Sequence, residues 1–287
     1  MRIAHLILAH KNPGQLERLI DALSHPAFDF YVHLDKKANL DDFVYLSGKG
    51  NVYFIKKRVN VKWAGYSLVQ AQLNGIQEIV DTKNYDYLNV LSAQDFPLKP
   101  PEYIFQFLKK NKGFEFISSV DEEKEPVWWQ VAKRRVTKYH LENWPDFPGK
   151  YRIQNAINLI TGTRKYPLPH KIVGRSQWFI ITSSAATYLV DFIKNNPKVV
   201  RFFKYVWGAD EFIFSTVLFN SPFKEKIRDH LFYIDWSEGK PNPKILREED
   251  FEKLIRSDKV FARKFDATAD ENILKRLEEH IGKETVV

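Results

Sequence analysis

The chain has 287 residues, a formal net charge of +8 and no cysteine. Because there is no thiol, disulfides, thiolate metal sites and cysteine nucleophiles are excluded. The excess of Lys and Arg favours anionic partners, such as nucleotide phosphates, acidic glycans, nucleic acid or an anionic membrane face. No run of about eighteen apolar residues is present, so no membrane span is expected. Residues 1–11 are too short and too interrupted by histidine for a signal peptide, so we expect a cytoplasmic protein.

Strands and helices are predicted to alternate up to residue 118. Apolar runs predict strands, and apolar side chains at helical spacing predict helices. The predicted strands are residues 2–9, 28–34, 51–55, 87–91 and 114–118, and the predicted helices follow Asn12 and cover residues 67–80 and 100–108. Asn12, Pro13 and Gln15 predict a capping box at the first helix. This order predicts an α/β fold with a mainly parallel central sheet flanked by helices.

Residues 120–170 differ in character, because they combine Trp128-Trp129, the basic cluster Lys133-Arg134-Arg135 and several prolines. A strand is again predicted over residues 172–182, and helices over residues 185–194, 210–219 and 271–280. Lys133-Arg134-Arg135 and a second cluster, Lys56-Lys57-Arg58, fit a solvated surface. The alternative is that they bind the protein to an anionic membrane.

Two carboxylates follow predicted strands. Asp35 comes after the strand over residues 28–34, and Asp95 after the strand over residues 87–91. Open parallel sheets bind ligands at these strand ends. Asp35 could bind a ribose or base edge, or cap the next helix. Asp95 could orient a sugar or hold a turn. The local sequence leaves both alternatives open.

Two further acids, Asp210 and Glu211, open a predicted helix after Trp207. Acids in a first helical turn complement the helix dipole, and Asp210 could serve as a cap. The functional alternative is a general base whose pKa is raised because Trp207 excludes water.

The segment of residues 261–266 (FARKFD) contains two adjacent cations, Arg263 and Lys264, between phenylalanines. Enzymes that bind nucleotide diphosphates often use a metal held by Asp-x-Asp, and this tripeptide pattern does not occur in the sequence. Arg263 and Lys264 could instead neutralise a diphosphate. The alternative is a surface pair with Asp266. The phenylalanines favour a segment that packs inward, where buried charges need fixed partners.

The sequence gives little support for a histidine metal site, a glycine-rich phosphate loop or a serine hydrolase site. His5, His10 and His33 do not have a metal-ligand spacing. Neither common glycine-rich phosphate loop is present, and no nucleophile-elbow sequence supports a serine hydrolase.

Several segments, in order along the chain, resemble motifs of the core-2/I-branching glycosyltransferases, a family of β-1,6-N-acetylglucosaminyltransferases and peptide O-xylosyltransferases. Each segment alone is weakly specific for the family, whereas the whole set in this order is strongly specific. The segments are residues 9–12 (AHKN), 32–37 (VHLDKK), 63–71 (WAGYSLVQA), 91–98 (LSAQDFPL), 176–179 (SQWF), 210–211 (DE), 220–222 (NSP) and 261–266 (FARKFD).

The resemblance implies a GT-A-like nucleotide-sugar fold and an inverting, metal-independent transfer from a UDP-sugar to a glycan hydroxyl, which gives a β-linkage. By position, it implies that Glu211 is the catalytic base and that Arg263 and Lys264 bind the diphosphate. It also implies that Asp35 contacts the uridine and that Val61 lines the uracil pocket. No metal or other cofactor is expected.

The donor-sugar and acceptor pocket is assigned to four further residues: Asp95, Trp178, Trp207 and Asp210. The whole chain, residues 1–287, is expected to form a single GT-A-like domain. Its expected parts are a nucleotide-binding half at residues 1–119, an acceptor-facing insertion at residues 120–170, and a catalytic and diphosphate-binding half at residues 171–287.

The sequence departs from animal members of this family, which carry many cysteines and an N-terminal membrane anchor. We therefore expect a bacterial-type enzyme that acts on a glycan or lipid-linked glycan at the inner face of the membrane, with peripheral contact to that anionic surface and no nucleic-acid partner. N-acetylglucosamine is placed slightly ahead of xylose as the donor sugar. A basic nucleic-acid-binding protein is the alternative from another class, and a catalytically silent glycan-binding relative is a third.

Overall fold

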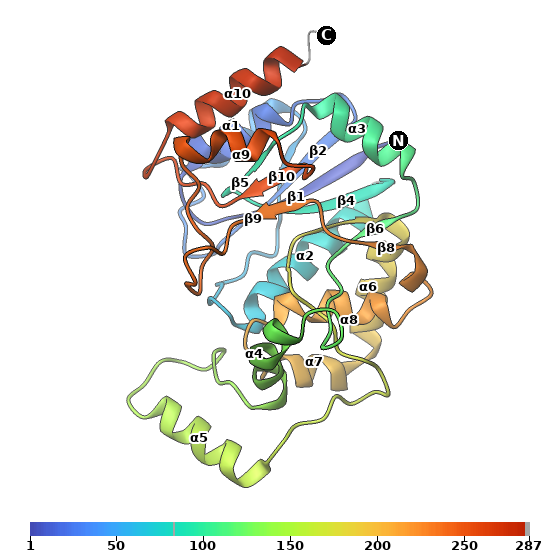
Figure 1. Ribbon diagram of the computed structural model, residues 1–287, viewed down its shortest axis with the longest axis vertical. Helices are drawn as coiled ribbons and strands as arrows, with labels where there is room; N and C mark the ends of the chain where they lie inside the picture. The colour runs from blue at the N-terminus through green and yellow to red at the C-terminus, as the bar shows by residue number, and fades with distance from the viewer. Residues whose placement is uncertain (83, 285–287) are drawn as a thin grey trace.

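The computed structural model describes residues 1–82 and 84–284 of the chain. Within these residues a seven-stranded sheet has the order β3-β2-β1-β4-β7-β6-β8, and a three-stranded sheet has the order β5-β10-β9 (Figure 1). The strands are β1 (Ile3–Ala9), β2 (Phe28–Leu34), β3 (Val52–Phe54), β4 (Tyr87–Ser92), β5 (Asp95–Pro97), β6 (Glu115–Phe116), β7 (Phe179–Thr182), β8 (Ile227–Arg228), β9 (Phe232–Ile234) and β10 (Phe261–Arg263).

The α-helices are α1 (Pro13–Ala22), α2 (Tyr66–Thr82), α3 (Pro101–Lys110), α4 (Pro126–Thr137), α5 (Lys150–Thr161), α6 (Ser183–Asn195), α7 (Pro197–Phe203), α8 (Ile213–Phe219), α9 (Phe251–Ile255) and α10 (Asn272–Glu284). Short 3-10 helices are η1 (Val44–Lys49), η2 (Ala209–Glu211), η3 (Lys224–Lys226) and η4 (Glu248–Asp250). None of the helices in the described part of the chain is both long and apolar enough to cross a bilayer.

The larger sheet is mainly parallel. β1 pairs in parallel with β2 and β4, β2 with β3, and β6 with β8, whereas β7 is antiparallel to β4 and β6. Every residue of β1, β2 and β4 is buried, as expected for strands covered on both faces. The predicted α/β fold with a mainly parallel central sheet flanked by helices is confirmed.

Helices cover both faces of this sheet. α1 and α3 lie on one side, and α2 and α6 lie on the other (Figure 1). A Cβ atom at Gly75 of α2 would collide with the Leu6 side chain of β1, so glycine permits the close approach of this helix to the sheet. The α5 helix lies at the end of the molecule opposite α10 (Figure 1).

Three local predictions are wrong. The capping box at α1 does not form, because the Gln15 side chain donates to the carbonyl oxygens of Ala93 and Phe265 and accepts from Ala267 N. The predicted strand over residues 172–182 is regular only from Phe179 onward. The predicted helix over residues 210–219 is divided into η2 and α8.

Candidate functional site

A pocket of about 520 Å³ lies where several strands end. Gln94 follows β4 and Lys264 follows β10, and both line it, which agrees with ligand binding at strand ends. Tryptophans form much of its wall: Trp63, Trp128, Trp178, Trp207 and Trp236. The predicted site residues that line it are Trp178, Trp207, Asp210, Glu211, Arg263 and Lys264. Asp35, Val61 and Asp95 lie outside its lining.

Asp210 and Glu211 reach the pocket because of a tight turn before η2. Gly208 has a φ of 63° there, a conformation that side chains disfavour, and a Cβ atom at this position would collide with Arg135 Nη2. The Asp210 side chain caps neither η2 nor α8, so the interpretation of this acid as a helix cap is wrong.

Arg135 of α4 holds the Glu211 carboxylate. Its Nη2 lies 3.0 Å from Glu211 Oε2, and its Nε donates to the Trp207 carbonyl oxygen at 3.1 Å. Its guanidinium lies 4.5 Å from the centre of the Trp207 ring and 4.9 Å from that of Phe212. The interpretation of Lys133-Arg134-Arg135 as a solvated surface is therefore wrong for Arg135. Lys133 and Arg134 are exposed, as that interpretation expects.

Burial raises the pKa of both pocket acids. The pKa of Glu211 rises because the carboxylate is desolvated, and Arg135 opposes this rise. Desolvation and then the charge of Glu211 raise the pKa of Asp210 to about 7. Asp210 Oδ1 is buried without a hydrogen-bond partner within the described residues. Asp210 therefore has a proton affinity suited to proton transfer near neutral pH, and the pKa of Glu211 is shifted in the same direction.

Arg263 pairs with a buried acid behind the pocket. It lies opposite Asp95 in the antiparallel pairing of β10 with β5, and its Nη1 is 3.4 Å from Asp95 Oδ1. Its guanidinium lies 4.0 Å from the centre of the Trp178 ring. Burial raises the pKa of Asp95 to about 6 while Arg263 opposes the shift. Asp95 Oδ2 also accepts from Ser92 N at 2.8 Å, which fits the interpretation that Asp95 holds a turn.

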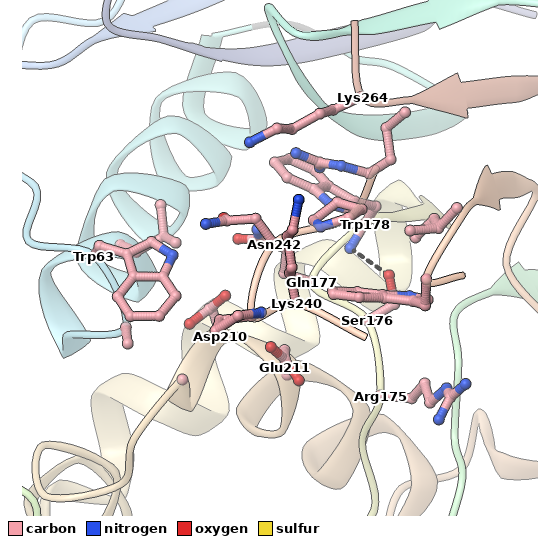
Figure 2. Close-up of a pocket in the computed structure, with 18 of the residues that line it drawn as sticks. Trp63, Arg175, Ser176, Gln177, Trp178, Asp210, Glu211, Lys240, Asn242 and Lys264 are labelled. Atoms are coloured by element: carbon pink, nitrogen blue, oxygen red, sulfur yellow. Dashed lines mark hydrogen bonds between the residues drawn. The ribbon is translucent and has the colours of Figure 1, made fainter. Parts of the chain in front are cut away.

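Lys264 differs from its neighbour because it is half-buried and extends toward the pocket. It lies across the pocket from Asp210 and Glu211 (Figure 2). Burial and the charge of Arg263 lower the pKa of Lys264. The alternative of a surface pair with Asp266 is wrong for Arg263, which is buried beside Asp95, and Asp266 accepts from Lys11 Nζ at 2.7 Å.

Asp35 and Val61 are brought together by Lys37. Asp35 is buried, and its Oδ1 accepts from Lys37 N at 2.9 Å. Lys37 Nζ donates to the Val61 carbonyl oxygen at 2.6 Å. A turn follows Asp35, so the interpretation of Asp35 as a cap of the next helix is wrong. The pKa of His10 is lowered by burial and by the charges of Lys11, Lys37 and Lys264.

The sequence interpretation missed the segment of residues 236–243, which follows β9 and lines the pocket. It contributes Trp236, Lys240 and Asn242, and Lys240 Nζ lies 2.9 Å from Glu238 Oε2. The glycine and prolines of this segment indicate a loop. Nothing in its local sequence indicates that it lines the same pocket as Asp210 and Glu211.

No group of three or more His, Asp or Glu side chains suited to a metal ion is found in residues 1–82 and 84–284. The expectation that catalysis needs no metal stays a prediction, because this arrangement does not test it.

Comparison with known proteins identifies the family. Residues 3–255 match the model of the family described as Core-2/I-Branching enzyme. Xylosyltransferase 2 of Canis lupus familiaris is 27% identical over 309 residues, which cover 98% of this chain and 34% of that protein. Xylosyltransferase 1 of the same organism is 24% identical over 308 residues, which cover 98% of this chain and 31% of that protein. The chain thus spans about a third of the length of these curated relatives.

Among solved structures, mouse xyloside xylosyltransferase 1 in its apo form aligns with a TM-score of 0.42 and 10% identity, over 91% of this chain and 97% of that chain. The resemblance drawn from the ordered sequence motifs is confirmed by the family model rather than by this structural alignment. Because that model covers most of the chain, the protein belongs to the Core-2/I-Branching enzyme family.

Proposed function

We propose that this protein is a glycosyltransferase that moves a sugar from a UDP-sugar to a hydroxyl of a glycan acceptor, with inversion and without a metal. The observation that carries the proposal is the Glu211 carboxylate, held 3.0 Å from Arg135 in a tryptophan-lined pocket and facing Lys264 across it. Membership of the family supports sugar transfer as the reaction class.

In the proposed reaction, Glu211 accepts the proton of the acceptor hydroxyl while the acceptor oxygen bonds to the anomeric carbon. The bond from that carbon to the diphosphate oxygen breaks, and UDP leaves with the electron pair. Attack from the face opposite UDP converts an α-linked donor into a β-linked product. Burial raises the proton affinity of Glu211, which suits proton acceptance, while Arg135 favours its ionised form.

The two adjacent cations are proposed to have different tasks. Lys264 is half-buried at the pocket surface and would contact the diphosphate directly. Arg263 is buried against Asp95 and Trp178, so it would act mainly by fixing the segment from which Lys264 extends.

We therefore expect Lys264→Ala to weaken UDP binding about 10- to 100-fold, as for loss of a charge-assisted hydrogen bond. Lys275→Ala, on the exposed face of α10, is the matched control for calorimetric titration with UDP.

Uridine is proposed to bind beside Asp35 and Val61, which Lys37 links. The charges of Lys37 and Lys264 both lower the pKa of His10, so both cations act on this one imidazole. Asp210 and Trp178 are proposed to contact the donor sugar or the acceptor. The acceptor is proposed to be a glycan or lipid-linked glycan, and a cytoplasmic location stays a prediction.

The donor sugar has two candidates. N-acetylglucosamine was favoured from the sequence, whereas the relatives reported above are xylosyltransferases, so xylose is supported at least as well. Incubation with a panel of UDP-sugars, followed by measurement of released UDP, tests the proposal and ranks the donors. Activity that EDTA abolishes and manganese restores would overturn the metal-free mechanism.

The family match favours the transferase over the nucleic-acid-binding alternative, and oligonucleotide binding without UDP release would reverse that order.

A further inference from the structure

The α5 helix packs against the protein through its polar side chains. Gln154 Oε1 accepts from Leu141 N at 2.9 Å. Asn158 accepts from Tyr139 N at 2.7 Å and donates to the Tyr139 carbonyl oxygen at 2.9 Å. Amphipathic helices of globular proteins normally bury their apolar side chains instead. In α5 the usual orientation is reversed.

The opposite side of α5 is apolar and exposed. We call this surface the α5 outer face, and it comprises Arg152, Ile153, Ala156, Leu159 and Ile160. Leu159 and Ile160 are 86% and 85% exposed, and Ile153 is 43% exposed. Single exposed apolar residues are common on proteins, whereas a helical face of them indicates a binding surface.

The segment of the chain that carries this face is positively charged. Residues 126–171, which contain α4 and α5, hold nine Lys and Arg residues but two Asp and Glu residues, so they account for most of the net charge of the chain. Arg152 belongs to the face itself, and Arg134 and Lys165 are exposed in the same segment. Exposed aliphatic side chains beside cations are typical of helices that lie in the interface of an anionic membrane.

We propose that the α5 outer face docks on an anionic lipid bilayer, with Leu159 and Ile160 inserted below the headgroups. A second copy of the chain would bring the same positive segment to the contact, and the like charges would repel. Docking through α5 does not require sugar transfer, so this inference goes beyond the proposed function. It would hold a pocket that includes Trp128 and Arg135 of the adjacent α4 near a membrane surface.

Sedimentation with lipid vesicles tests the proposal. The full chain is mixed with vesicles of phosphatidylcholine alone or with a third of phosphatidylglycerol, at low and at high salt. We expect binding to the anionic vesicles that weakens with salt. The double variant Leu159→Glu/Ile160→Glu should bind at least about tenfold more weakly, because two aliphatic side chains no longer insert.

The matched control is Val44→Glu/Tyr103→Glu, which adds the same charge at two apolar residues, each 46% exposed, on η1 and α3. It should bind vesicles nearly as the unchanged protein does. Ile153→Glu is a second variant of the same face. Absence of binding to anionic vesicles, or equal binding by the α5 double variant, would overturn the proposal. A dimer in sedimentation velocity that the α5 double variant dissociates would identify a second copy as the occupant instead.

Discussion

The pocket and the α5 outer face use similar residues for different purposes. Both combine large apolar side chains with arginines, and α4, which supplies Arg135 to the pocket, lies next to α5 in the chain. In the pocket both arginines named above have fixed acidic partners, Arg135 with Glu211 and Arg263 with Asp95. On α5, Leu159 and Ile160 are exposed to solvent. Burial and partners, more than composition, therefore distinguish a chemical site from a docking surface.

The strongest test of this comparison is Glu211→Gln, which removes the proposed base and keeps the shape of the side chain. We expect UDP release to fall about 10²- to 10⁴-fold, the usual contribution of a general base. UDP affinity should change little, because the substitution leaves Lys264 in place. Glu123→Gln is the matched control, since Glu123 is 84% exposed and pairs with Lys171. Unchanged turnover in Glu211→Gln would remove this residue from the mechanism.

The free energy of unfolding provides the next test, because removal of one member of a buried ion pair leaves the other charge buried without its partner and destabilises the fold. Arg263→Met should destabilise the fold at pH 7 by about 3–5 kcal/mol, since Asp95 is left as an uncompensated charge. Urea unfolding of Arg263→Met, compared with Asp95→Asn/Arg263→Met, measures this loss, and the double variant should recover part of it.

The pH dependence of that loss has a definite sign. The pKa of folded Asp95 is about 6, above its ordinary value of 3.8, so the folded state binds more protons between these values. The contribution of Asp95 to stability therefore falls as the pH rises through this window. Without Arg263 the pKa rises further, so the deficit of Arg263→Met should be smaller at pH 5 than at pH 7. An equal deficit at both pH values would contradict the assigned pairing.

A smaller effect is expected from the arginine that was assigned to the surface from sequence. Arg135→Gln removes the charge that opposes the raised pKa of Glu211, so that pKa should rise and the base should be protonated at higher pH. The acid limb of the pH profile for UDP release should move up by about one unit or more. Arg134→Gln, at the exposed neighbouring position, should leave the profile unchanged. Equal profiles for both variants would show that Arg135 does not tune the base.

Arg135 also shows where prediction from sequence ends. Its pairing with Glu211 depends on how α4 and η2 pack together, and no local pattern encodes that contact. Long elements with regular apolar spacing, such as β1 and α2, were predicted nearly to their ends. The strands β8, β9 and β10 are too short to show any period. Glu211 and Lys264 were identified from the ordered family motifs, which carry information about the site that periodicity does not.

The smallest effect on stability and on UDP release is expected from substitutions on the α5 outer face. Leu159→Glu/Ile160→Glu should change the free energy of unfolding by no more than about 0.5 kcal/mol, since both side chains are already exposed to water. UDP release without vesicles should also stay unchanged, because neither residue lines the pocket. Urea unfolding and the UDP-release assay check both expectations. A large loss of stability would mean that Leu159 and Ile160 pack against the protein, and the α5 outer face would then belong to its core.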